Sequence, residues 1–141
     1  MGVLVAAGGV GAWLIALSWM DIRHRRLPNW LTLPGAAVIV TGAVLGGHGV
    51  AASLGALGLC AVYAAIHLAA PRAMGAGDVK LAIGLGALTG AFGFGPWVFA
   101  AVGASVLTSV VALWHLMRGG ASVVPHGPSM CAAAVVAVVL A

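Results

Sequence analysis

Six apolar segments divide the chain of 141 residues, and short stretches of charged residues, glycine or proline separate them. The first segment has about 18 residues without a charge, close to the minimum that crosses a hydrocarbon core of roughly 30 Å. The last segment has only 13 residues after Pro128, so we expect a thin, tilted helix or a broken one. The pattern predicts an all-α, polytopic membrane protein with about six transmembrane helices, at residues 3–20, 30–46, 50–70, 79–91, 97–117 and 129–141.

The composition also favours a membrane location. Apolar residues make up 63% of the chain and charged residues 6%, whereas soluble domains have roughly 45–50% and about 25%. Glycine is abundant, with 22 residues, and small residues let membrane helices approach closely. Gly42 and Gly46, like Gly86 and Gly90, have GxxxG spacing. We interpret both pairs as ordinary helix packing, with a homo-oligomer as the alternative.

The basic residues predict an orientation in the membrane. They occur only in or beside the first, third and fifth connections, so the formal charge of +4 does not indicate a nucleic-acid partner. By the positive-inside rule these connections are cytoplasmic and both termini lie outside the cell membrane. No base precedes the first segment, which argues against a secretory signal peptide. The basic residues are Arg23, Arg25, Arg26, Arg72, Lys80 and Arg118.

Asp21 and Asp78 are the only acidic side chains, and the predicted topology brings both to the cytoplasmic boundary. Taken alone, Asp21 is a charge in a loop and Asp78 is a helix N-cap. Together they indicate a functional pair, because carboxylates at a membrane boundary are rare and costly. Two neighbouring carboxyls in low-dielectric surroundings cannot both ionise easily, so they share a proton. One can then activate water while the other donates to a carbonyl oxygen, which is aspartic-protease chemistry and needs no metal or cofactor.

Three stretches, residues 75–81 (GAGDVKL), 21–29 (DIRHRRLPN) and 125–128 (PHGP), together resemble a known family. It is the prepilin peptidases, the type IV leader peptidase family of GxGD intramembrane aspartyl proteases. Residues 75–81 (GAGDVKL) resemble the GxGDxKL motif of that family. Residues 21–29 (DIRHRRLPN) are similar to its first aspartate motif. Residues 125–128 (PHGP) resemble its PFGP stretch, with His126 where phenylalanine is usual.

The resemblance implies that Asp21 and Asp78 are catalytic and that prepilins or pseudopilins are cut at the cytoplasmic face. It assigns the active-site loop or the substrate approach to Pro28, Asn29, Gly75, Gly77 and Lys80. The two glycines have a physical use there, since residues without side chains let an extended substrate backbone approach. Longer members carry an N-terminal domain with paired CxxC motifs and methylate the product. We expect residues 1–141 to be a single peptidase domain without that activity.

The remaining polar and aromatic residues receive simpler interpretations. Lys80 is two positions from Asp78 and does not share its helix face, so we expect it to reach lipid phosphates. No HxxxH or Cys/His ligand spacing occurs, so a metal site is not expected. We therefore do not expect His24, His67, His115 and His126 to bind a metal. We interpret Cys60 and Cys131 as small core residues, and Trp13, Trp19 and Trp114 as lipid-facing or interfacial residues.

The sequence leaves one alternative of a different class. In it the chain is a small membrane transporter, channel or pilus-assembly scaffold, and Asp21 and Asp78 are a cation site or topology marks. A peptidase requires both carboxylates for cleavage, whereas a transporter shows ion-dependent flux and no proteolysis. The partners expected of the peptidase are prepilin precursors and membrane lipids.

Overall fold

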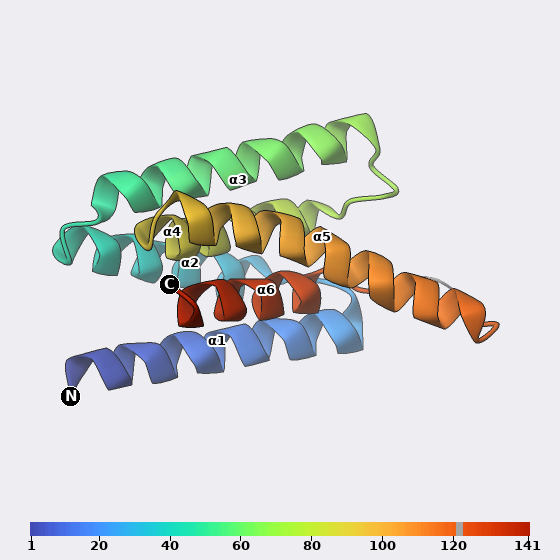
Figure 1. The fold of residues 1–141 in the computed structure, drawn as a ribbon, viewed down its shortest axis with the longest axis horizontal. Helices are drawn as coiled ribbons and strands as arrows, with labels where there is room; N and C mark the ends of the chain where they lie inside the picture. The colour runs from blue at the N-terminus through green and yellow to red at the C-terminus, as the bar shows by residue number, and fades with distance from the viewer. Residues whose placement is uncertain (121–122) are drawn as a thin grey trace.

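The computed structural model describes residues 1–120 and 123–141. Within these residues the chain forms an all-helical bundle whose helices run roughly side by side (Figure 1). The helix-rich, strand-free fold of this described part confirms the predicted fold class. The elements are α1 (Gly2–His24), α2 (Asn29–Leu45), α3 (Gly49–Ala69), α4 (Ala76–Ala91), α5 (Phe94–Met117) and α6 (Gly127–Val139).

Among the described residues, three helices are long and apolar enough to cross a membrane: Leu4–His24 within α1, Gly49–Ala69 and Phe94–Met117. Helices α2 and α6 are shorter apolar helices. The outer surface of the bundle is covered with large apolar side chains, such as Leu57 at 68% exposure and Val110 at 59%. Such a surface is stable in lipid and unfavourable in water. The protein is therefore a membrane protein.

Helix α4 lies at the centre of the bundle and packs against α2, α3, α5 and α6. Half of its residues are buried, although it is the segment expected to be a short span. Small residues make this position possible, because a Cβ atom at Gly86 or Gly90 would overlap the backbone of α3 at Gly55. The GxxxG spacing of Gly86 and Gly90 is thus used for helix packing, as expected. By contrast, a Cβ at Gly42 would meet nothing within 4 Å.

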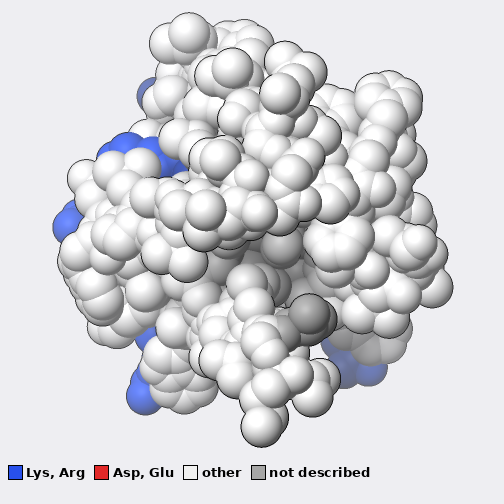
Figure 2. All heavy atoms as spheres, turned by 90° about the vertical axis from the view of Figure 1, so that its left-hand side faces the viewer, with Lys and Arg blue, Asp and Glu red and all other residues white. Residues whose placement is uncertain are grey.

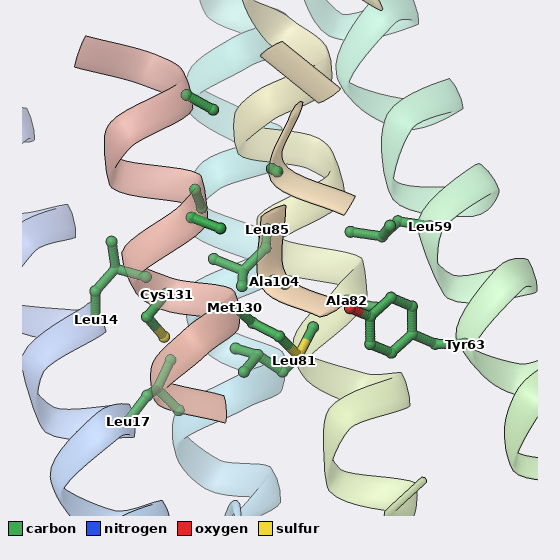
Figure 3. Packing of buried hydrophobic residues seen from close by; sticks show 14 of the residues in the cluster. Leu14, Leu17, Leu59, Tyr63, Leu81, Ala82, Leu85, Ala104, Met130 and Cys131 are labelled. Carbon is green, nitrogen blue, oxygen red and sulfur yellow. The ribbon is translucent and has the colours of Figure 1, made fainter. Parts of the chain in front are cut away.

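The core gathers around α4 and the first turns of α6. Leu17 of α1, Leu81 and Leu85 of α4 and Met130 of α6 are all at most 2% exposed. Figure 3 shows these side chains meeting between the helices, with the Tyr63 ring pointing from α3 into the same interior. This packing ties α1, α4 and α6 together next to the two aspartates.

The charged residues are segregated along the bundle. At one end of the bundle α1 ends, α2 begins, α3 ends and α4 begins (Figure 1). The two connections there and the helix turns beside them carry five of the six Lys and Arg residues: Arg23, Arg25, Arg26, Arg72 and Lys80. Figure 2 shows the opposite end, where the N-terminus lies; its face is almost free of Lys and Arg, which appear only at the margins, and no acidic atoms are visible. The alternation of basic and neutral connections in the sequence therefore corresponds to two physically distinct ends.

Two expectations about tryptophans and lipid have different outcomes. Trp13 is not lipid-facing: its Nε1 donates a hydrogen bond of 2.8 Å to the Leu31 carbonyl oxygen, and its ring occupies the space left by Gly35 and Gly84. Helix α1 is apolar on all sides, so the hydrophobic pattern did not reveal which face packs inward. Trp19 and Trp114 are exposed at 58% and 55%, in agreement with a lipid-facing or interfacial position.

Candidate active site

Asp21 lies inside a helix and not in a loop, which corrects one of the simpler interpretations. Helix α1 continues to His24, and the Asp21 side chain, in its last turn, is only 7% exposed. Its Oδ2 accepts a hydrogen bond of 2.9 Å from the backbone N–H of Gly127. Because Gly127 is the first residue of α6, this carboxyl group lies at a helix N-terminus, where a negative charge is stabilised.

Gly127 fits this position because it has no side chain. A Cβ atom there would lie 2.5 Å from Asp21 Oδ2 and 3.1 Å from the carboxyl carbon. Any other residue would therefore push the carboxyl group away or displace the start of α6. The hydrogen bond between Asp21 and the start of α6 therefore depends on glycine at residue 127.

Asp78 lies in the first turn of α4 and does not cap it, which corrects the second simpler interpretation. Gly75 is the N-cap residue, no side-chain cap bond is formed, and Asp78 is the third helical residue. A Cβ atom at Gly75 would lie 3.4 Å from Asp78 Oδ2, so the chain before α4 passes directly beside the carboxyl group. Gly75 itself is exposed, which leaves its backbone accessible next to Asp78.

The fold brings Asp21 and Asp78 together, although 57 positions separate them in the sequence. Their carboxyl groups are close enough for the charge of Asp21 to act on Asp78. The negative charge of Asp21 disfavours ionisation of Asp78, because two like charges at one end of the bundle repel each other. A protonated and an ionised carboxyl group at the same end of the bundle can supply an acid and a base for hydrolysis.

The connection between α1 and α2 lies over this end of α4. Leu27 is 8% exposed, and a Cβ atom at Gly77 would be 3.2 Å from its Cβ. Lys80 Nζ donates a hydrogen bond of 2.7 Å to Asn29 Oδ1. The Lys80 ammonium group thus joins α4 to the start of α2, and its contact with lipid phosphates stays a prediction. Pro28, in an extended conformation, is the N-cap of α2.

A cluster of three side chains next to the aspartates was not recognised as a unit from the sequence. His126 Nε2 is hydrogen-bonded to the Tyr63 hydroxyl at 3.0 Å, and Nδ1 to Thr108 Oγ1 at 2.6 Å. These residues come from α3, α5 and the residue before α6, so no sequence spacing relates them. One signal was available: Tyr63 is the only tyrosine of the chain, in an otherwise apolar segment.

The histidines do not form a metal site in the part of the chain that the structure describes, where no three His, Cys, Asp or Glu side chains could hold an ion. His67 Nδ1 is bonded instead to the Met74 carbonyl oxygen at 2.7 Å. Burial lowers the pKa of His126. Its imidazole is therefore neutral, and one ring nitrogen donates a hydrogen bond while the other accepts one.

These features define a helical membrane protein with two carboxyl groups at one end of the bundle, of which Asp21 is buried and Asp78 is half-buried. Comparison with protein families gives a match over residues 9–113 to the type IV leader peptidase family. The match includes both Asp21 and Asp78 and ends before residues 125–128. The chain belongs to the type IV leader peptidase family and is a peptidase. Searches among curated proteins and among solved structures gave no significant match.

Proposed function

We propose that this protein is a membrane-embedded aspartic endopeptidase that removes the leader peptide of type IV prepilins or pseudopilins at the cytoplasmic face. The observation that carries the proposal is that Asp21 and Asp78, the only acidic side chains of the chain, lie at the same end of the bundle and interact electrostatically. Membership of the leader peptidase family supports the substrate class. The peptidase activity is assigned to residues 1–141 as one domain, without methyl transfer.

The two carboxyl groups have different surroundings, which suggests separate roles. The Gly127 N–H and the N-terminus of α6 stabilise a negative charge on Asp21. We therefore assign Asp21 as the base that takes a proton from the attacking water. Asp78 is then the protonated partner that donates to the carbonyl oxygen of the scissile peptide.

The reaction needs no group other than these carboxyls and water. Water oxygen bonds to the peptide carbonyl carbon while its proton passes to Asp21 and the proton of Asp78 passes to the carbonyl oxygen. Asp21 then returns its proton to the leaving nitrogen, the C–N bond breaks, and Asp78 recovers its proton from the collapsing intermediate. The products are the leader with a new carboxyl end and the mature protein with a new amino end.

The approach of an extended substrate is supported by the backbone beside Asp78. Gly75 is exposed, and Gly77 has no side chain to separate a passing peptide from the first turn of α4. Gly77 contacts Leu27 in the loop between α1 and α2. Movement of that loop, which Asn29 and Lys80 fasten to α4, would expose this backbone to a substrate.

The membrane orientation follows from the positive-inside rule. The basic residues gather at the end of the bundle where the aspartates lie, so that end faces the cytoplasm and both termini lie outside. A newly made prepilin presents its basic leader on the cytoplasmic face. The proposed site and the proposed substrate thus meet on the same side.

Co-expression with a panel of candidate prepilins tests the proposal. We expect one or more of them to become shorter, and N-terminal sequencing of the product to give a single new amino end. The control is the same panel without this protein. Absence of any cleavage while the protein is inserted and abundant, together with ion-dependent flux in proteoliposomes, would instead favour a transporter.

A further inference from the structure

The Tyr63, His126 and Thr108 side chains converge between α3, α5 and α6, directly beside the aspartates. We propose that His126 is a positioning residue, which holds the Gly127 N–H against Asp21 and the Tyr63 hydroxyl in the core next to the first turns of α4. This inference rests on the proposed function, because it assigns His126 a part in that reaction. His126 itself does not touch the reacting atoms.

The imidazole of His126 is fixed from both sides. Its Nε2 lies 3.0 Å from the Tyr63 hydroxyl and its Nδ1 lies 2.6 Å from Thr108 Oγ1. The Tyr63 and His126 rings also contact each other, with centroids 5.7 Å apart and planes inclined by 35°. A ring held by two hydrogen bonds and one ring contact has little freedom to rotate, so the backbone at His126 is held as well.

The backbone at His126 determines where α6 begins. His126 is the N-cap of α6, and its carbonyl oxygen accepts a hydrogen bond of 3.0 Å from the Met130 N–H. The next residue, Gly127, donates to Asp21 at 2.9 Å. Only one peptide unit therefore separates the anchored imidazole from the N–H that binds one aspartate.

Tyr63 extends the cluster toward α4, the helix that carries the second aspartate, Asp78. Tyr63 is 3% exposed, and it packs in the same core cluster as Leu81 and Ala82 of α4, one turn after Asp78. The His126 bond fixes the direction of the Tyr63 hydroxyl, since a buried hydroxyl turns toward its nearest partner. His126 thus links the surroundings of Asp78, on α4, to those of Asp21, on α1.

Substitutions at His126 distinguish positioning by its two hydrogen bonds from simple packing of its ring. Phenylalanine keeps the ring and removes both hydrogen bonds. The amide of glutamine can take the place of Nε2 and keep the Tyr63 bond, whereas the shorter asparagine can take the place of Nδ1 and keep the Thr108 bond. His115→Phe is the matched control, because His115 is exposed in the last turn of α5.

We expect His126→Phe to lower kcat for leader cleavage by roughly 10- to 100-fold, the cost of a small misplacement of catalytic groups, with KM little changed. His126→Gln should recover most of the rate, and Tyr63→Phe should cost as much as His126→Phe, with no further loss in the double variant. His115→Phe should be unaffected. Full activity of His126→Phe, beside an active wild type, would overturn the proposal, and so would a loss confined to KM.

A second measurement does not depend on activity. Labelling histidine with 13C at the carbonyl and glycine with 15N selects His–Gly pairs, of which the chain has two: His48–Gly49 and His126–Gly127. In the full chain in detergent, Asp21→Asn changes the group that accepts the Gly127 hydrogen bond, so it should shift the Gly127 amide signal. That shift would establish that the signal reports on this bond. Tyr63→Phe, which leaves the pair intact, should move it too, and the Gly49 signal should stay.

The two measurements keep the inference and the proposed function distinguishable. If the wild type cleaves no prepilin, the proposed function fails, and the Gly127 signal still decides whether the cluster positions this N–H. If Tyr63→Phe leaves the Gly127 signal in place while Asp21→Asn moves it, the positioning role is wrong whatever the activity.

Discussion

The backbone N–H of Gly127 donates a hydrogen bond of 2.9 Å to the Asp21 carboxylate, across 106 positions of the sequence. This bond joins the last turn of α1 to the first residue of α6. Asp21 is thereby directed into the bundle, toward α4 and Asp78, although it follows a membrane-length apolar segment. The close contact leaves no room for a side chain at residue 127.

Gly127→Ala tests this contact. The added Cβ atom would lie 2.5 Å from Asp21 Oδ2, so we expect the carboxyl group to move and cleavage to fall by about 100-fold or more. Gly103→Ala in α5 is the control, because its Cβ would meet the nearest atom at an ordinary 3.5 Å. Prepilin cleavage is measured with protein amounts matched by immunoblot. Wild-type cleavage by Gly127→Ala would show that the contact is not required.

Gly86→Ala tests the central position of α4. The added methyl group would overlap the Gly55 carbonyl oxygen of α3, and overpacking of this kind typically costs about 1–3 kcal/mol of unfolding free energy. Gly42→Ala should be neutral or stabilising by less than about 1 kcal/mol, since nothing lies within 4 Å and alanine is the better helix former. Unfolding in mixed micelles measures both. Equal stability of the two variants would contradict the described packing.

The hydrogen bond between Lys80 and Asn29 predicts a coupled effect on cleavage. Lys80→Met and Asn29→Ala each release the start of α2 from α4, so we expect each to change kcat/KM by about two- to tenfold. The double variant should differ little from either single one. Arg72→Met, in the exposed turn after α3, is the control for lost positive charge. Additive effects of the two substitutions would mean that the residues act independently.

The membrane orientation predicts which sites a water-soluble thiol reagent can reach. In a background with Cys60 and Cys131 replaced by alanine, single cysteines at Gly47 and Phe94 should label from outside the cell. Cysteines at Arg25 and Ala73 should label only after the membrane is opened. The reverse pattern would place the aspartates on the outer side and rule out cleavage of prepilins at the cytoplasmic face.

Much of the fold could be predicted from the sequence because lipid requires long apolar helices. The expected segments and the observed helices agree closely for α2 and α3. The position of Asp21 was predicted less well. The apolar run ends at Met20, but a helix does not stop where hydrophobicity stops, and no residue between Asp21 and His24 breaks it. The next obstacle to a helix is Pro28.

That Asp21 and Asp78 lie at one end of the bundle could be anticipated because acidic residues are so scarce. Asp21 follows the first apolar segment and Asp78 precedes the fourth, so the predicted topology places both on the same side of the membrane. The cluster around His126 could not, because its three members lie on separate helices and depend on how those helices pack. Asp21 and Asp78 stand out chemically in the sequence; Thr108 does not, and only the packing brings it to His126.

Cleavage of a prepilin by Asp21→Asn, Asp78→Asn and the double variant tests the two-aspartate mechanism most directly. Asparagine matches aspartate in size, so each change removes the ionisable group and little else. We expect each single variant to be inserted, abundant and inactive, and the double variant to be hardly worse than either, because groups that act as a unit lose activity non-additively. Substantial cleavage by Asp21→Asn, at protein amounts matched by immunoblot, would contradict the mechanism and leave Asp78 in need of a different partner.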